Sequence, residues 1–116
     1  MGSYMEAGKT GEFQDGSQKK VTLQGQEIML ARVGGNYYAI AGRCPHMGGD
    51  LWLGRLEGTV ITCPRHGSQF DIKDGHNIRW TNWTGIISAV SKAVKSPRPV
   101  RTYKVKVEGD KILVEV

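Results

Sequence analysis

Two short motifs, Cys44-Pro45-His46 and Cys63-Pro64-Arg65-His66, contain both cysteines and two of the three histidines of this 116-residue chain. Residues 47–62 separate the motifs. Thiolates and imidazoles are metal ligands, and two cysteines that each stand beside a histidine make a poor disulfide framework. A fold that uses all four side chains in one site must bring two loops together. This requirement limits the architectures open to the chain.

The residues around these motifs predict short strands separated by tight turns. Sixteen glycines are many for this length and indicate a turn-rich β protein rather than a helical bundle. Gly34-Gly35-Asn36 divides two apolar segments and predicts a β-hairpin. We expect strands at Val21–Leu23, Ile28–Val33, Tyr37–Ile40, Val60–Thr62, Phe70–Ile72, Tyr103–Val107 and Ile112–Val116. The expected fold class is therefore all-β, an antiparallel sandwich or barrel, with both motifs in loops beside strands.

One segment departs from this β pattern. Between Thr84 and Val94 apolar residues recur at helical spacing, Thr84 is suited to cap the first turn, and Pro97 limits extension. We therefore expect one short helix, inserted within residues 76–95. Its simplest role is to cover one side of the sheet, and contact with a partner or a membrane surface is the alternative.

The order of the ligands bears on which metal group they hold. A zinc ion and an iron–sulfur cluster both accept two sulfur and two nitrogen ligands. Structural zinc sites commonly pair like ligands, two cysteines at one turn and two histidines on a helix. Here each motif is mixed, which suits a binuclear cluster whose two irons take two cysteines and two histidines respectively. The order favours a [2Fe–2S] cluster over zinc.

The extended motifs Cys44–Gly49 and Cys63–Asp71 resemble those of the Rieske family, whose members carry Cys-x-His and Cys-x-x-His at a similar separation. Segments Tyr37–Ile40, Leu51–Leu56 and Tyr103–Asp110 extend the resemblance to residues 12–116.

This resemblance implies one Rieske [2Fe–2S] cluster per chain. Cys44 and Cys63 would bind one iron, and His46 and His66 the other. It further implies that residues 1–116 form a single Rieske domain with a small cluster-binding subdomain, whose loops lie at about 42–72.

Several positions differ from the high-potential members of that family, which carry an extra cysteine in each loop. Gly49, or the neighbouring Gly48, and Arg65 stand at those positions here, so no disulfide can form between the loops. A serine and a tyrosine donate hydrogen bonds to sulfur in those proteins. Ser68 matches the serine, but Phe70 has no hydroxyl. Because hydrogen bonds to sulfur raise the reduction potential, we expect a value toward the lower part of about −150 to +300 mV. Deprotonation of the ligating histidines should make it fall at alkaline pH.

Charge and hydropathy limit the partners. The formal net charge is +5, but the basic residues are scattered and not interleaved with aromatic ones, which argues against nucleic-acid binding and suggests acidic protein partners. Arg65 lies between ligands and is a candidate docking contact, whereas His76 is expected at the surface. No apolar run is long enough to span a membrane, and no apolar secretory segment begins the chain, so a cytoplasmic location is expected.

The function expected from these features is that of a soluble one-electron carrier. The resemblance implies a flavin-dependent reductase as donor and an oxygenase or another oxidoreductase as acceptor. Outside the motifs, no residues suggest a general base, nucleophile or substrate pocket, so the chain is not expected to be an enzyme. Two alternatives remain open: a non-catalytic electron-transfer subunit that uses residues 80–94 as its interface, and a zinc-bound or metal-free interaction module.

Overall fold

The computed structural model describes residues 3–45, 48–65, 67–79 and 98–116 of the chain. In chain order the elements are β1 (Tyr4–Lys9), η1 (Thr10–Glu12), β2 (Gln18–Leu23), β3 (Gln26–Val33), β4 (Asn36–Ala41), η2 (Leu51–Leu53), β5 (Arg55–Glu57), β6 (Val60–Thr62), β7 (Gln69–Asp71), β8 (Asn77–Arg79), β9 (Thr102–Tyr103), β10 (Val105–Glu108) and β11 (Lys111–Glu115). Every pairing between these strands is antiparallel.

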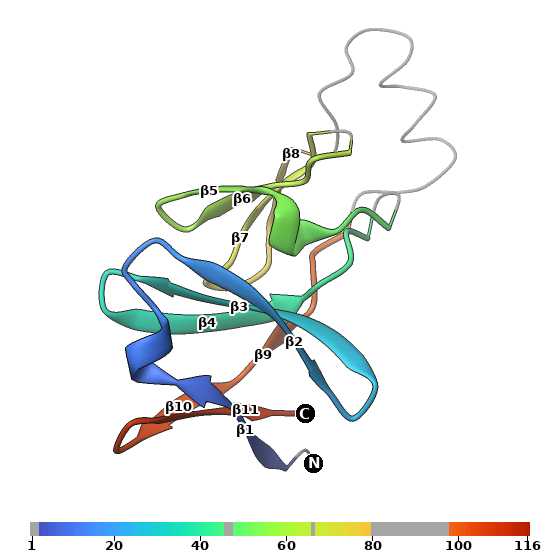
Figure 1. The fold of residues 1–116 in the computed structure, drawn as a ribbon. Helices are drawn as coiled ribbons and strands as arrows, with labels where there is room; N and C mark the ends of the chain where they lie inside the picture. Colours follow the sequence, from blue (N-terminus) through green and yellow to red (C-terminus); the bar gives the residue numbers. More distant parts are fainter. Residues whose placement is uncertain (1–2, 46–47, 66, 80–97) are drawn as a thin grey trace, which may run out of the picture.

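The strands form three sheets that follow one another along the molecule (Figure 1). One end is the sheet β1-β11-β10, where the two termini also lie. The middle sheet has the order β2-β3-β4-β9, and the other end is the sheet β5-β6-β7-β8. We call this last sheet, with the loops that lead into it, the loop subdomain (residues 42–79).

Two hydrophobic clusters fill the spaces between the sheets. The first cluster lies between the sheet β1-β11-β10 and the middle sheet, and it includes the fully buried Ile28, Leu30 and Ile112. The second includes the fully buried Met29, Ile40, Ile61 and Phe70 together with Cys44 and Cys63. Alternate residues of β3 therefore point to opposite cores, as strand periodicity requires. Each fully buried aliphatic or aromatic side chain stabilises the fold by about 1.5–3 kcal/mol.

The all-β architecture confirms the expected fold class. The hairpin at Gly34-Gly35 is formed, with Val33 opposite Asn36. The expected helix, like most of the 76–95 segment, lies outside the described residues. Among those described, no helix combines the length and apolar character needed to cross a membrane.

Three strands were not predicted. In β1, Glu6 and Gly8 flank a register irregularity, so the alternation of apolar residues is lost. Strands β5 and β8 have three residues each and are mostly polar, which is too little pattern to recognise. In the C-terminal hairpin, Val105 pairs with Val114 and Val107 with Ile112, and Val107 is 45% exposed on β10, an outer strand of its sheet.

Candidate metal centre

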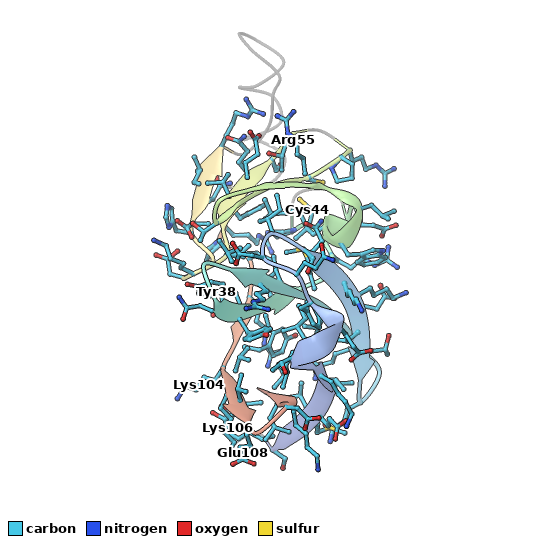
Figure 2. The ribbon with its side chains drawn as sticks, turned by 60° about the vertical axis from the view of Figure 1, so that its left-hand side comes forward. Tyr38, Cys44, Arg55, Lys104, Lys106 and Glu108 are labelled. Carbon is cyan, nitrogen blue, oxygen red and sulfur yellow. The ribbon has the colours of Figure 1, made fainter. Side chains whose placement is uncertain are left out.

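Both cysteines lie in loops that follow strands. Cys44 follows the end of β4, and Cys63 directly follows β6. Each cysteine is only 3% exposed and belongs to the second hydrophobic cluster, between the middle sheet and the loop subdomain. Figure 2 shows Cys44 on the loop-subdomain side of the middle sheet, away from Lys106 and Glu108 at the opposite end. The two thiols are therefore shielded from water by apolar side chains, although they lie in loops.

The two loops have the same backbone hydrogen-bond pattern. In the first, the amide of Gly48 donates to the carbonyl of Cys44 (2.8 Å), and the amide of Cys44 donates to the carbonyl of Gly49 (2.8 Å). In the second, Gly67 donates to Cys63 (3.1 Å), and Cys63 donates to Ser68 (2.7 Å). The fourth residue after each cysteine is a glycine with positive φ, +72° and +74°, a region that glycine occupies without strain. The chain thus builds one turn twice.

Gly49 lies where the two loops meet. Its carbonyl binds the amide of Cys44, and a Cβ on this residue would lie 2.6 Å from Sγ of Cys63 and 3.2 Å from Cβ of Arg65. The backbone of one loop thus lies directly against the thiol of the other. The site therefore contains two buried thiols and, beside them, backbone so close that a single methyl group would fill the remaining space. Such a site fits a sulfur-ligated metal group.

The other two ligand candidates, His46 and His66, lie outside the described residues. They stand two and three positions after the cysteine of their respective turns. Among the described residues, no group of three His, Cys, Asp or Glu side chains could hold a metal ion. The complete set of four ligands therefore remains a prediction.

The third histidine, His76, is at the surface, as expected. Its ring Nδ1 lies 2.6 Å from Oδ1 of Asp74, and its amide donates to the same oxygen at 3.0 Å. These bonds, that of the backbone amide first, hold the pKa of the Asp74 carboxyl below its usual value. His76 thus belongs to a local turn.

Ser68 and Phe70 are both fully buried in the loop subdomain. Ser68 closes the second turn through its carbonyl, and Phe70 pairs with Ile61 in the sheet. Phe70 thus places a hydrocarbon ring with no hydroxyl group in the same hydrophobic cluster as the two cysteines.

Two arginines that the sequence did not single out contact the loops. Arg43 donates to Glu27 (3.1 Å) and to Asp50 (2.9 Å), and Arg79 donates twice to the carbonyl of Gly67. The hydrogen bond from Arg43 lowers the pKa of the Glu27 carboxyl, and the same bond raises the pKa of Arg43. No sequence pattern marks either residue, because their partners come from elsewhere in the fold.

A shallow hollow of about 270 Å³ opens between the loops at the surface. Its lining residues are Arg43, Gly48, Gly49, Asp50, Leu53, Pro64 and Arg65. Leu53 is 68% exposed, and Arg65 is also exposed. An apolar side chain beside a cation is a suitable contact for another protein.

The fold and the site define an antiparallel β metalloprotein whose two buried thiols are presented by two equivalent loops. Residues 3–104 match the family model of the Rieske [2Fe–2S] domain. The chain therefore belongs to the Rieske family, as the motifs predicted. Its cofactor is a Rieske-type [2Fe–2S] cluster, which the cradle and the two thiols fit.

The chain is similar to ferredoxin components of dioxygenase systems, and the similarity extends over nearly their whole length. The ferredoxin component of the naphthalene 1,2-dioxygenase system of Pseudomonas aeruginosa is 30% identical over 105 residues, which is 90% of this chain and 88% of that protein. The ferredoxin component of the biphenyl 2,3-dioxygenase of Rhodococcus jostii (strain RHA1) is 28% identical, over 92% of this chain and 87% of that one. Among solved structures, the ferredoxin of carbazole 1,9a-dioxygenase from Nocardioides aromaticivorans IC177 superposes with a TM-score of 0.78 at 27% identity, covering 97% of this chain and 96% of that one.

Proposed function

We propose that this protein is a one-electron carrier, which accepts an electron from a reductase and passes it to an oxygenase or another oxidoreductase. The observation that carries this proposal is the pair of buried thiols in two equivalent loops, which meet beneath a hollow open to a partner protein. Relatives that are ferredoxin components of dioxygenase systems, matched along nearly their full length, support an oxygenase as acceptor.

We assign the ligands as Cys44 and Cys63 to one iron, and His46 and His66 to the other. When bound, the cluster supplies one-electron redox chemistry. The second hydrophobic cluster around the two cysteines excludes water, and the amides of Gly48 and Gly67 close the two turns that carry the thiols. These residues hold and tune the group, and none of them is assigned a catalytic reaction.

The wider assignment follows the same reasoning. Residues 1–116 form a single Rieske domain that acts in the cytoplasm. Its loop subdomain docks on acidic faces of its redox partners. The names of the relatives support a role as carrier rather than catalyst.

Metal analysis combined with EPR tests the assignment directly. We expect two irons per chain, and a spectrum of the reduced protein in which two histidine nitrogens couple to the unpaired electron. Voltammetry should give a one-electron wave toward the lower part of about −150 to +300 mV. Stoichiometric zinc, or the absence of a wave in iron-loaded protein, would contradict the electron-carrier assignment.

Reversing the charge of Arg65 should slow electron transfer without changing the cluster. Arg65 lines the hollow and is exposed, so Arg65→Glu would place a like charge against an acidic partner. We expect the rate to fall by about tenfold at low ionic strength and the difference to shrink at high salt.

The assay for this variant uses the reductase and oxygenase of a naphthalene 1,2-dioxygenase system, with stopped-flow detection. Lys111→Glu, at the first residue of β11 in the opposite end sheet, makes the same charge change as a control. Equal slowing by both variants would show that net charge, and not the loop end, guides docking.

A further inference from the structure

Arg79 anchors the second loop through a single carbonyl group. Its Nε and Nη2 donate to the oxygen of Gly67 at 3.0 and 2.9 Å. Gly67 follows His66 directly, and its amide closes the turn onto Cys63. A planar guanidinium with two donors on one oxygen fixes the direction of that carbonyl more tightly than one rotatable donor can.

Arg43 occupies the corresponding place at the first loop. Its Nη1 lies 3.5 Å from the carbonyl oxygen of Gly48, at the long end of the hydrogen-bond range, and 2.9 Å from Asp50. Gly48 is the counterpart of Gly67 in the repeated turn, so equivalent carbonyls each face a guanidinium. Glu27 binds the other side of Arg43, with Nε–Oε2 at 3.1 Å and Nη2–Oε1 at 3.3 Å.

These carbonyls matter because a peptide unit is planar and trans. The N–H of the next residue therefore points opposite to the C=O. When Arg79 holds the Gly67 carbonyl at the exposed side, the N–H of Ser68 is directed inward, where the buried Ser68 side chain and Cys63 lie. By the same geometry, holding the Gly48 carbonyl directs the N–H of Gly49 inward, and Gly49 lies against Sγ of Cys63.

The two arginines differ in how their charge is balanced. Arg43 pairs with both Glu27 and Asp50. No carboxylate in the described part of the chain forms an ion pair with Arg79. Within the described residues Arg79 therefore adds a positive charge beside the second loop that no carboxylate balances, and such a charge favours a group that becomes more negative on reduction.

We propose that Arg79 and Arg43 are positioning residues: each holds a turn carbonyl outward, so that the amides of Ser68 and Gly49 point at the cluster sulfurs and raise its reduction potential. The proposal rests on the proposed function, because it needs a cluster between the loops. Arg79 has the larger effect, since it makes two short bonds and its charge is not balanced within the described residues.

The test compares Arg79→Lys and Arg79→Gln with the wild type by voltammetry. Lysine keeps the charge but has no planar fork, and glutamine loses both. We expect the potential to fall in both variants, further in Arg79→Gln, while the thermal unfolding midpoint stays near that of the wild type. Arg101→Gln, which removes the same charge outside both loops, should leave the potential unchanged. Arg43→Gln should lower it less than Arg79→Gln does.

A second readout does not require redox activity. Amide hydrogen exchange at Ser68, measured on the cluster-free chain, should be faster by about tenfold in both Arg79 variants, because a charge-assisted hydrogen bond to the loop is lost. A wild-type potential in Arg79→Lys would show that charge alone acts, and unchanged exchange would show that Arg79 does not hold the peptide. Either result overturns the proposal. Absence of a cluster from the wild type would instead overturn the proposed function.

Discussion

Replacing Gly49 with alanine is expected to abolish cluster binding while the chain still folds. A Cβ at this position would lie 2.6 Å from Sγ of Cys63, well inside van der Waals contact. In the metal-free chain the thiol can rotate away at small cost. A thiolate bonded to iron cannot move without breaking its metal–ligand geometry. The added methyl group and the ligated sulfur therefore compete for the same space.

Reconstitution with iron and sulfide, followed by visible absorption and iron analysis, measures this effect. Gly49→Ala should retain less than about a tenth of the wild-type cluster, in line with the roughly 10–100-fold losses of metal affinity that follow changes to groups around the ligands. Its far-UV circular dichroism should match that of the metal-free wild type.

Gly11→Ala is the matched control for this substitution. Gly11 has no positive φ, and its Cβ would meet no atom within 4 Å. We expect it to load a full cluster. Full loading of Gly49→Ala as well would mean that the loops separate when the cluster binds, and the close approach of Gly49 to Cys63 would not describe the loaded protein.

The sequence was informative where chemistry is local. Three features each occupy a few consecutive residues: the Cys-Pro motifs, the hairpin at Gly34-Gly35 and the apolar alternation of residues 112–116. The structure confirms the hairpin turn and the C-terminal strand. The motifs also identified the family, because two cysteines and two histidines, one of each per loop, match the ligand set of a Rieske centre.

Tertiary features of the site could not be read in the same way. The equivalence of the two turns appears only in their hydrogen bonds, since the histidines stand at different offsets from the cysteines. Arg79 lies twelve residues beyond Gly67 and in a strand too short to predict. Arg43 depends on Glu27, which lies sixteen residues earlier on β3. Contacts of this kind join residues that are distant in the sequence, so they can be identified only once the fold is known.

The second large effect concerns the turn that joins the loop subdomain to the middle sheet. Gly75 is buried, its amide donates to Asp71 (2.7 Å), and its carbonyl accepts from Val100 (2.9 Å). The next residue, Arg101, accepts a hydrogen bond from Ala41 of β4 through its carbonyl. The turn after β7 is thus bound to the middle sheet through residues 100–101.

Alanine at position 75 should destabilise the fold by about 3 kcal/mol, through two separate costs. The residue has φ +82°, which costs a non-glycine residue about 1 kcal/mol. In addition, its Cβ would overlap the carbonyl oxygen of Val100 and lie 3.0 Å from Cγ2 of Thr102. Moving this backbone apart breaks the bond between Val100 and Gly75, and we assign about 2 kcal/mol to this second cost.

Gly109→Ala isolates the first cost. Its φ is +63°, but its Cβ would meet no atom within 4 Å, so only the backbone strain of about 1 kcal/mol should remain. Urea unfolding of the metal-free variants measures both free energies. Equal destabilisation by the two substitutions would show that the backbone around Gly75 moves to accommodate the methyl group without a loss of stability. Residues 100–101 would then not fix the loop subdomain against the middle sheet. If Gly75→Ala destabilises the fold by about 2 kcal/mol more than Gly109→Ala, this junction contributes to the rigidity of the cluster site. The reason is that the sheet with β6 and β7, the strands on either side of the Cys63 loop, is attached to the middle sheet through this junction.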